Sequence, residues 1–367
     1  MPDPRIKKLA DLLVNYCVKV QPGQWVFIDS HIIAEPLANE VLRAVLEAGG
    51  LPTIIMESDD ILETSLKYAN EEQLSWVSPT LKTLCEEADV LIALRAAGNT
   101  RHLSGIDPKK QQLQRQAYQD LLKTYITRAA EGELKWTLTQ YPCLAYAQDA
   151  EMSLSEYQDF VHAATYSDQE DPVAEWERIH DEQQKIVDWL NGKKQVTVKS
   201  PNADLSLSIK GRSFINSDGS VNMPSGEVFT GPVEDSANGW VEFTYPAIEQ
   251  GKEVTGIRLE FKDGKVEKAS AEKNQEFLLA MLDSDEGARF LGEFAIGTNY
   301  GIQKFTKSIL YDEKIGGSFH LALGAGYPET GSKNESSIHW DMICDIREDS
   351  EIHVDGELLY KDGEFQI

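Results

Sequence analysis

The sequence predicts an α/β fold followed by an α+β fold: an N-terminal α/β domain with a mostly parallel sheet, and a C-terminal β-rich domain. The first half alternates short apolar runs with amphipathic segments, which is the pattern of a parallel sheet covered by helices. The second half alternates apolar and polar residues between repeated Asp-Gly turns, which favours antiparallel hairpins. The length of 367 residues suits about two domains.

The first half begins with a helix and strand rhythm that repeats three times. In chain order, the predicted helices and strands cover residues 4–19, 25–28, 35–48, 52–56, 72–87 and 88–94. The strands are short continuous apolar runs, and the helices carry apolar residues at three- and four-residue spacing. No GxGxxG sequence follows any of these strands, so a dinucleotide-binding fold is disfavoured.

Helical patterns continue up to residue 192. The remaining helices of this half are predicted at residues 107–133, 154–165 and 172–190. Ser153 and Glu156 have the spacing of a capping box at the start of the second of these. Asn191-Gly192 ends the third, where the residue pattern changes. We therefore expect two domains, residues 1–192 and residues 193–367.

The second half is predicted to be mostly antiparallel. Residues 196–198 and 205–209 alternate with period two, and Asp-Gly pairs begin at positions 218, 263, 355 and 362. One helix is expected near residues 272–282. These short strands and turns are typical of antiparallel sheets.

Charge and composition exclude several classes of function. Lys and Arg total 35 and Asp and Glu total 61, which gives a formal net charge of −26. Nucleic acids and anionic membranes attract basic proteins, so neither is an expected partner. No apolar run approaches the ~20 residues of a membrane-spanning helix, and no leader pattern precedes the first helix. The four cysteines are scattered, which favours a reducing, cytoplasmic location.

His339 and Asp341 are the first chemical signal. On an extended strand, residues two apart point to the same face, so this imidazole and carboxylate would converge on one point. They would form a sound ligand pair for a divalent ion. The alternative is a plain His–Asp hydrogen bond on a strand surface.

His320 is the second signal, because it lies in an apolar stretch that reads as a buried strand. A buried imidazole needs a polar partner, and the simplest partner is a backbone carbonyl. Tyr327 follows after Gly324-Ala325-Gly326, a turn that would bring the phenol back beside His320. The alternative role for Tyr327 is that of a core tyrosine.

Glu227 and Glu293 are acids set among glycine and apolar residues. A buried carboxylate without a partner is costly, so a nearby cation would explain both. The alternatives are an exposed loop acid for Glu227 and a helix-end acid for Glu293. Taken together, these nitrogen and oxygen ligands would suit two divalent ions that share a carboxylate.

Several longer stretches carry a family likeness. In chain order they are VQPGQWVFIDS, LRAVLEAGGLPTIIM, NMPSGEVFTGP, LGEFAIGTN, DEKIGGSFHLALG and GSKNESSIHWDMICD. They resemble motifs of the M29 metallopeptidases, the thermophilic-type aminopeptidases, over essentially the whole chain. The resemblance implies two domains, a dinuclear metal site in the second, and a homodimer.

The resemblance also implies roles for individual residues. The metal ligands would be Glu227, Glu293, His320, His339 and Asp341, with Glu293 bridging the two ions, and Tyr327 would be the active-site tyrosine. The ions would be zinc, cobalt or manganese, because two imidazoles make magnesium less natural.

The expected function is that of a metal-dependent aminopeptidase. It would hydrolyse the N-terminal residue from short peptides with a free N-terminus, using a water activated by two metals. Glu227 and Glu293 are both candidates for the general base, and Tyr327 either ligates metal or stabilises the oxyanion. Two alternatives are a hydrolase of a small non-peptide amide with the same site, and a non-catalytic homologue with a degenerate site.

Overall fold

The computed structural model describes residues 3–249 and 251–367, and the chain forms two compact units. The first unit runs to Glu175 and also takes in Gly219–Pro224. The second contains Trp176–Asp218 and Ser225–Ile367. The units therefore divide near the start of helix α10 (Pro172–Leu190), whereas the sequence pattern suggested residue 192. Ile186 and Leu190 of α10 belong to the core of the second unit, so the second unit begins before α10 ends and not after it.

The first unit contains the parallel sheet that the sequence predicts. Its strand order is β2-β1-β3-β4-β8, and every neighbouring pair is parallel. The strands are β1 (Trp25–His31), β2 (Leu51–Glu57), β3 (Val90–Arg95), β4 (Lys135–Gln140) and β8 (Asn222–Met223). Strand β4 was not predicted, and β8 comes from the short segment that interrupts the second unit.

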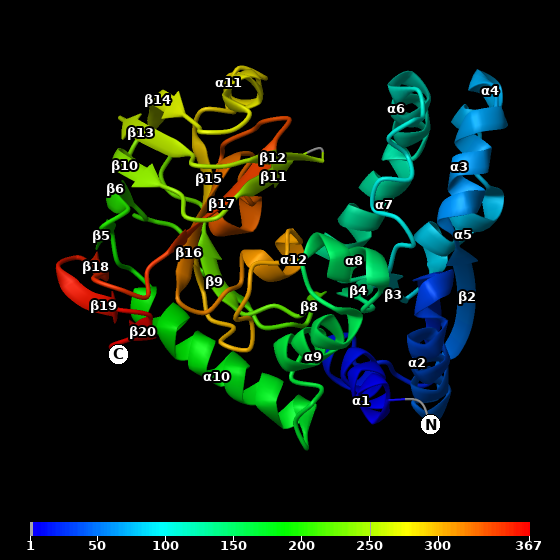
Figure 1. Ribbon diagram of the computed structural model, residues 1–367. Helices are drawn as coiled ribbons and strands as arrows, with labels where there is room; N and C mark the ends of the chain where they lie inside the picture. The colour runs from blue at the N-terminus through cyan, green and yellow to red at the C-terminus, as the bar shows by residue number, and fades with distance from the viewer. Residues whose placement is uncertain (1–2, 250) are drawn as a thin grey trace. The chain divides into compact units, whose positions relative to one another are not determined.

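Helices cover both faces of this sheet (Figure 1). They are α1 (Pro4–Leu12), η1 (Leu13–Cys17), η2 (Ile32–Ala34), α2 (Glu35–Glu47), α3 (Asp59–Tyr68), α4 (Glu71–Ser75), α5 (Pro79–Glu87), α6 (Pro108–Ala117), α7 (Gln119–Ala130), α8 (Leu144–Asp149) and α9 (Leu154–Ala164). Phe27 of β1 packs with Leu84 of α5. On the other face, Val26 of β1 and Val45 of α2 both lie against Gly50. The alternation of strand side chains thus decides which helix each residue meets.

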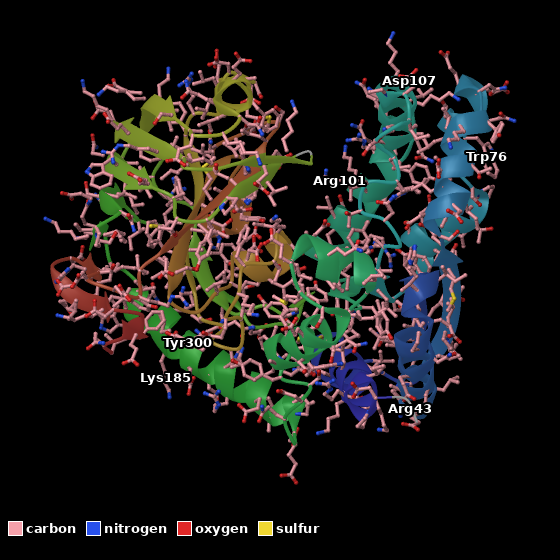
Figure 2. All side chains as sticks on the ribbon, viewed as in Figure 1. Arg43, Trp76, Arg101, Asp107, Lys185 and Tyr300 are labelled. Atoms are coloured by element: carbon pink, nitrogen blue, oxygen red, sulfur yellow. The ribbon has the colours of Figure 1, made fainter. Side chains whose placement is uncertain are left out.

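Local sequence explains where several of these helices begin and end. Ser153 Oγ accepts from the Glu156 N–H, and Glu156 Oε2 accepts from the Ser153 N–H, which confirms the capping box. The predicted helix over residues 107–133 is two helices separated at Tyr118. Figure 2 shows Asp107 at the start of α6 and Trp76 between α4 and α5, at the end of the unit away from Arg43.

The second unit is built from antiparallel sheets, as predicted. An eight-stranded sheet has the order β14-β13-β10-β6-β5-β18-β19-β20, and a five-stranded sheet has the order β17-β16-β15-β9-β7. The elements are β5 (Gln195–Ser200), β6 (Ala203–Ser208), β7 (Ile215–Ser217), β9 (Glu227–Thr230), β10 (Asn238–Glu242), β11 (Ala247–Glu249), β12 (Lys252–Val254), β13 (Arg258–Lys262), β14 (Lys265–Ser270), α11 (Gln275–Leu282), β15 (Leu291–Gly297), α12 (Ile309–Asp312), β16 (Ser318–Gly324), η3 (Pro328–Thr330), β17 (His339–Asp345), β18 (Glu351–Val354), β19 (Glu357–Lys361) and β20 (Glu364–Phe365).

The two large sheets share one hydrophobic core. Leu205 and Val241 of the eight-stranded sheet belong to the same buried cluster as Phe294 and Leu321 of the five-stranded sheet. Every residue of β15 and β16 is buried. Strands buried on both faces give a rigid frame for any side chain that they carry. In the described ranges, none of the helices has the length and apolar character needed to cross a membrane.

Candidate metal centre

The five predicted ligands lie on four strands of the five-stranded sheet. Glu227 begins β9, Glu293 lies in β15, His320 lies in β16, and His339 and Asp341 lie in β17. The strand register explains why they meet. Ala322 pairs with Glu293 on one side and with Asp341 on the other, and Ala295 pairs with His320. Small alanine side chains between the polar residues leave room for a cluster on this face.

His320 faces three carboxylates through one nitrogen. Its Nε2 lies 3.5 Å from Glu227 Oε2, 3.6 Å from Glu293 Oε1 and 4.0 Å from Asp341 Oδ1. The alternative in which a backbone carbonyl partners His320 is not what the structure shows, since His320 Nδ1 has no hydrogen-bond partner in the described part of the chain. The other ring nitrogen, Nε2, is the one that faces the acidic centre.

His339 faces the same centre from the neighbouring strand. Its Nε2 lies 3.2 Å from Glu293 Oε2 and 3.6 Å from Asp341 Oδ1. The two oxygens of Glu293 therefore face two different histidines. Glu293 with Glu227 and His320 forms one group of metal-ligand size, and Glu293 with His339 and Asp341 forms another, the ligand atoms of each group lying within 4.8 Å of one another.

Burial and hydrogen bonding show that these residues fit a bound cation. Glu227 is 6% exposed, Glu293 4% and His320 1%. Within the described ranges, Glu227 Oε2 and Asp341 Oδ1 have no hydrogen-bond donor, although a buried unpaired carboxylate oxygen is costly. His339 Nδ1 lies 2.7 Å from the Ala325 carbonyl oxygen. Because a carbonyl only accepts, Nδ1 donates and Nε2 keeps its lone pair for a metal.

The acidic surroundings also shift the pKa values of the two histidines. Burial acts to lower the pKa of His320, but Glu293 and Glu227 raise it overall, to about 9. His339 is shifted in the same way, and Glu293 and Asp341 raise its pKa to about 10. The acidic surroundings of the cluster therefore favour positive charge at its centre.

The carboxylates respond to the same surroundings in different directions. Burial raises the pKa of Glu227 and of Asp341. Burial acts on Glu293 as well, but hydrogen bonding to His320 and His339 lowers its pKa overall. Glu293 is thus the carboxylate held most firmly in its ionised form. It lies in the middle of a buried strand, so the helix-end role considered for it is wrong.

Tyr327 lies at the edge of the cluster. Its ring centroid is 5.1 Å from that of His339 and 5.3 Å from that of Phe229. The two rings that it contacts belong to β17 and β9 of the five-stranded sheet, and the expected place beside His320 stays a prediction. Partial burial, together with the charges of Glu293 and Asp341, raises the pKa of Tyr327. The phenol therefore keeps its proton and is able to donate a hydrogen bond.

Two residues of the cluster were missed by sequence reasoning. Glu313 forms a third group of metal-ligand size with His320 and Asp341. Lys314 is completely buried, and its Nζ lies 3.7 Å from Glu227 Oε1 and contacts Glu313 Oε1. A run of charged residues before Gly316-Gly317 is typical of an exposed turn, so no local signal pointed to burial. Burial acts to lower the pKa of Lys314, but these two glutamates raise it overall.

The known proteins that this chain resembles are consistent with a metal site. A family model described as thermophilic metalloprotease (M29) matches residues 2–365. The protein is therefore a metallopeptidase, a hydrolase of peptide bonds that depends on a divalent metal. The chain belongs to the M29 family.

Named relatives match over nearly the full length. The chain is 30% identical to aminopeptidase 2 of Geobacillus stearothermophilus, covering 96% of this chain and 91% of that protein. It is 27% identical to aminopeptidase T of Thermus thermophilus, covering 98% and 95%. The solved structure of wild-type AmpT from Thermus thermophilus aligns with a TM-score of 0.86 and 24% identity over 99% of both chains. That likeness shows a shared fold.

Proposed function

We propose that this protein is an aminopeptidase that removes the N-terminal residue from short peptides by means of two divalent metal ions. The names of the relatives support the aminopeptidase part of this proposal. The ligands would be Glu227, Glu293, His320, His339 and Asp341.

The observation that carries the two-metal proposal is the division of Glu293 between the two histidines. Oε1 faces His320 Nε2, and Oε2 faces His339 Nε2. A carboxylate that directs each oxygen to a different imidazole has the geometry of a bridging ligand. The two groups of ligands that meet at Glu293 have no other member in common. One ion would take Glu227 and His320 with Glu293, and the other would take His339 and Asp341 with Glu293.

When bound, the ions would polarise the scissile carbonyl and lower the pKa of a water molecule towards neutrality. The protein would supply the other components of the reaction. Glu227 or Glu293 would accept the proton of the attacking water. Tyr327 would donate a hydrogen bond to the oxyanion of the tetrahedral intermediate, or would instead ligate metal. The mixed imidazole and carboxylate ligands favour zinc, cobalt or manganese over magnesium.

The proposal includes a homodimer, as the family resemblance implies, and a cytoplasmic location, as the scattered cysteines suggest. The four cysteines form no disulfide bond with one another, which fits a reducing compartment. Analytical ultracentrifugation of the purified protein would test the dimer, and a monomer at micromolar concentration would contradict it.

The central experiment combines elemental analysis with an aminopeptidase assay on one sample. We expect two divalent ions per chain, turnover of aminoacyl anilides and short peptides with a free N-terminus, loss of activity with a chelator, and recovery with added metal. The matched control is the same substrate with an acetylated N-terminus. Equal turnover of the acetylated substrate would contradict aminopeptidase activity.

Two alternative functions predict different results in the same assay. Faster turnover of simple amides than of peptides would favour a non-peptide amidase that uses the same site. Less than one ion per chain, without turnover of any substrate, would favour a non-catalytic homologue.

A further inference from the structure

Lys314 is the one fully buried lysine in the described part of the chain. Lysine is almost never fully buried unless it is paired. Its backbone is fixed between α12 and β16, because its N–H donates to the Tyr311 carbonyl and its carbonyl accepts from the Asn299 N–H. The side chain has no exposed area, so it does not contact a substrate. Any part that it plays in the reaction passes through the groups that it touches.

Those groups are two carboxylates of the metal cluster. The ammonium lies 3.7 Å from Glu227 Oε1 and contacts Glu313 Oε1. The other oxygen of Glu227, Oε2, faces His320 Nε2 at 3.5 Å. Lys314 therefore takes one oxygen of Glu227 and leaves the other directed at the centre of the cluster.

The charges of the cluster explain why a lysine is needed there. Glu227, Glu293, Glu313 and Asp341 bring four negative charges together, and the two imidazoles must be neutral to bind metal. Lys314 is then the one cationic side chain in contact with the described ligands once metal is bound. Without it, Glu227 would be free to turn both oxygens to one ion, and Glu313 would face Glu227 with no cation between them.

We propose that Lys314 is a positioning residue of the metal centre, which bridges Glu227 and Glu313 and keeps Glu227 as a ligand through one oxygen. This inference rests on the proposed two-metal function. Groups that orient metal ligands through a charged contact are worth about 10- to 100-fold in metal affinity. The expected consequence is a specific loss of metal binding, in addition to any loss of stability.

The test compares four proteins stripped of metal with a chelator. They are the wild type, Lys314→Met, which removes the charge but keeps the length, Lys314→Arg, which keeps the charge, and Lys210→Met, which makes the same change at an exposed lysine. Titration calorimetry with zinc and manganese gives the dissociation constants and the stoichiometry. Thermal melts without metal give the effect on stability.

We expect Lys314→Met to bind metal about 10- to 100-fold more weakly than the wild type. Lys314→Arg should recover most of this loss, and Lys210→Met should bind as the wild type does. In the activity assay, added metal should restore the kcat of Lys314→Met. The accompanying change in KM should be smaller than the change in kcat. If Lys314→Met does not fold, Lys314→Gln is neutral and polar and should show the same weakening.

The outcomes separate this inference from the proposed function. A wild-type protein that binds no divalent metal would overturn both. A wild type with two ions, together with a Lys314→Met protein of unchanged affinity and lower melting temperature, would overturn only the inference and leave Lys314 a structural residue. Tighter binding by Lys314→Met would also overturn it, because Lys314 would then be a competitor of the metal.

Discussion

Two clusters of histidine and carboxylate, one in each unit, contain the same residue types and differ in their hydrogen bonding. In the first unit, His31 Nε2 lies 3.4 Å and His102 Nδ1 3.8 Å from Asp59 Oδ1. In the second unit, His339 Nε2 faces Glu293 and Asp341 at similar distances.

The backbone partner of each histidine determines the tautomer. The Ile33 N–H donates to His31 Nδ1, so the neutral ring carries its proton on Nε2 and directs it towards Asp59. His339 Nδ1 instead donates to the Ala325 carbonyl, so the neutral ring turns a lone pair towards two carboxylates. The His31 Nε2–H faces the Asp59 carboxylate at 3.4 Å without forming a hydrogen bond in the described chain, but a donor facing an acceptor needs no further ion, whereas lone pairs facing each other need a cation.

The carboxylates show the same difference. Asp59 Oδ2 accepts from the N–H groups of Gly98 and Asn99, whereas Glu227 and Asp341 each leave one oxygen without a donor in the described chain. The groups of metal-ligand size found among the described residues all lie in the second unit. Residue type therefore identifies both clusters as candidates, and the hydrogen bonds to the backbone separate them.

The largest effect is expected for Glu293→Gln. Glutamine keeps the shape of the side chain but removes the charge that faces both histidines, so both ions should be lost and kcat should fall roughly 100- to 1,000-fold or more. Metal content and turnover measure this, and circular dichroism checks the fold. Glu267→Gln on exposed β14 is the control. An active Glu293→Gln protein would show that Glu293 does not bridge.

Tyr327→Phe is expected to have the next largest effect. Loss of one oxyanion donor lowers kcat roughly 100-fold or more, with metal content unchanged. Tyr300→Phe is the matched control, because the Tyr300 hydroxyl donates to the Gly363 carbonyl and not to a group of the metal cluster. Tyr300 is labelled in Figure 2. A fall in metal content together with kcat would instead identify Tyr327 as a ligand.

A smaller effect is expected in the pH dependence of stability without metal. His320 and His339 have folded-state pKa values of about 9 and about 10, above the usual 6.5 of the unfolded chain. Their protonation stabilises the fold fully below pH 6.5, and this contribution, on the order of a few kcal/mol, is lost as pH rises through 9 and 10. Melts of chelated protein should therefore fall over this range, while the stabilisation by added metal grows. A stabilisation by metal that is constant with pH would contradict this.

The smallest effect is expected for His31→Gln and His102→Gln. If the N-terminal cluster is held by hydrogen bonds alone, neither variant should change the metal content of the protein. Elemental analysis of both variants beside the wild type measures this. Loss of an ion from either variant would remove the distinction between the two clusters.

The elements that local pattern specifies were predictable from the sequence. Continuous apolar runs gave β1, β2 and β3, and the two-residue spacing of His339 and Asp341 placed both on one face of β17. Strand β4 was missed because its buried residues are Thr137 and Thr139, which do not form an apolar run.

The site was less predictable where tertiary contacts decide burial. Glu293 was considered as a helix-end acid because it follows the helical stretch near residue 282, and nothing local shows that a strand begins between them. Glu313 and Lys314 have the composition of an exposed turn. Lys314 is nevertheless buried and Glu313 half-buried, where the long-range pairing of β9 and β15 places Glu227. Ordering of this kind depends on contacts that no local window contains.

Strand β8 has a consequence for how the chain folds during synthesis. The edge of β4 is completed by Asn222 and Met223, which leave the ribosome after α10 and the first strands of the second unit. The N-terminal sheet is therefore not complete when its own contiguous sequence has emerged. An expression fragment that ends at residue 175 would leave β4 with unpaired backbone groups, a known route to strand-to-strand aggregation. Fragments intended for separate study should carry a graft of residues 219–224.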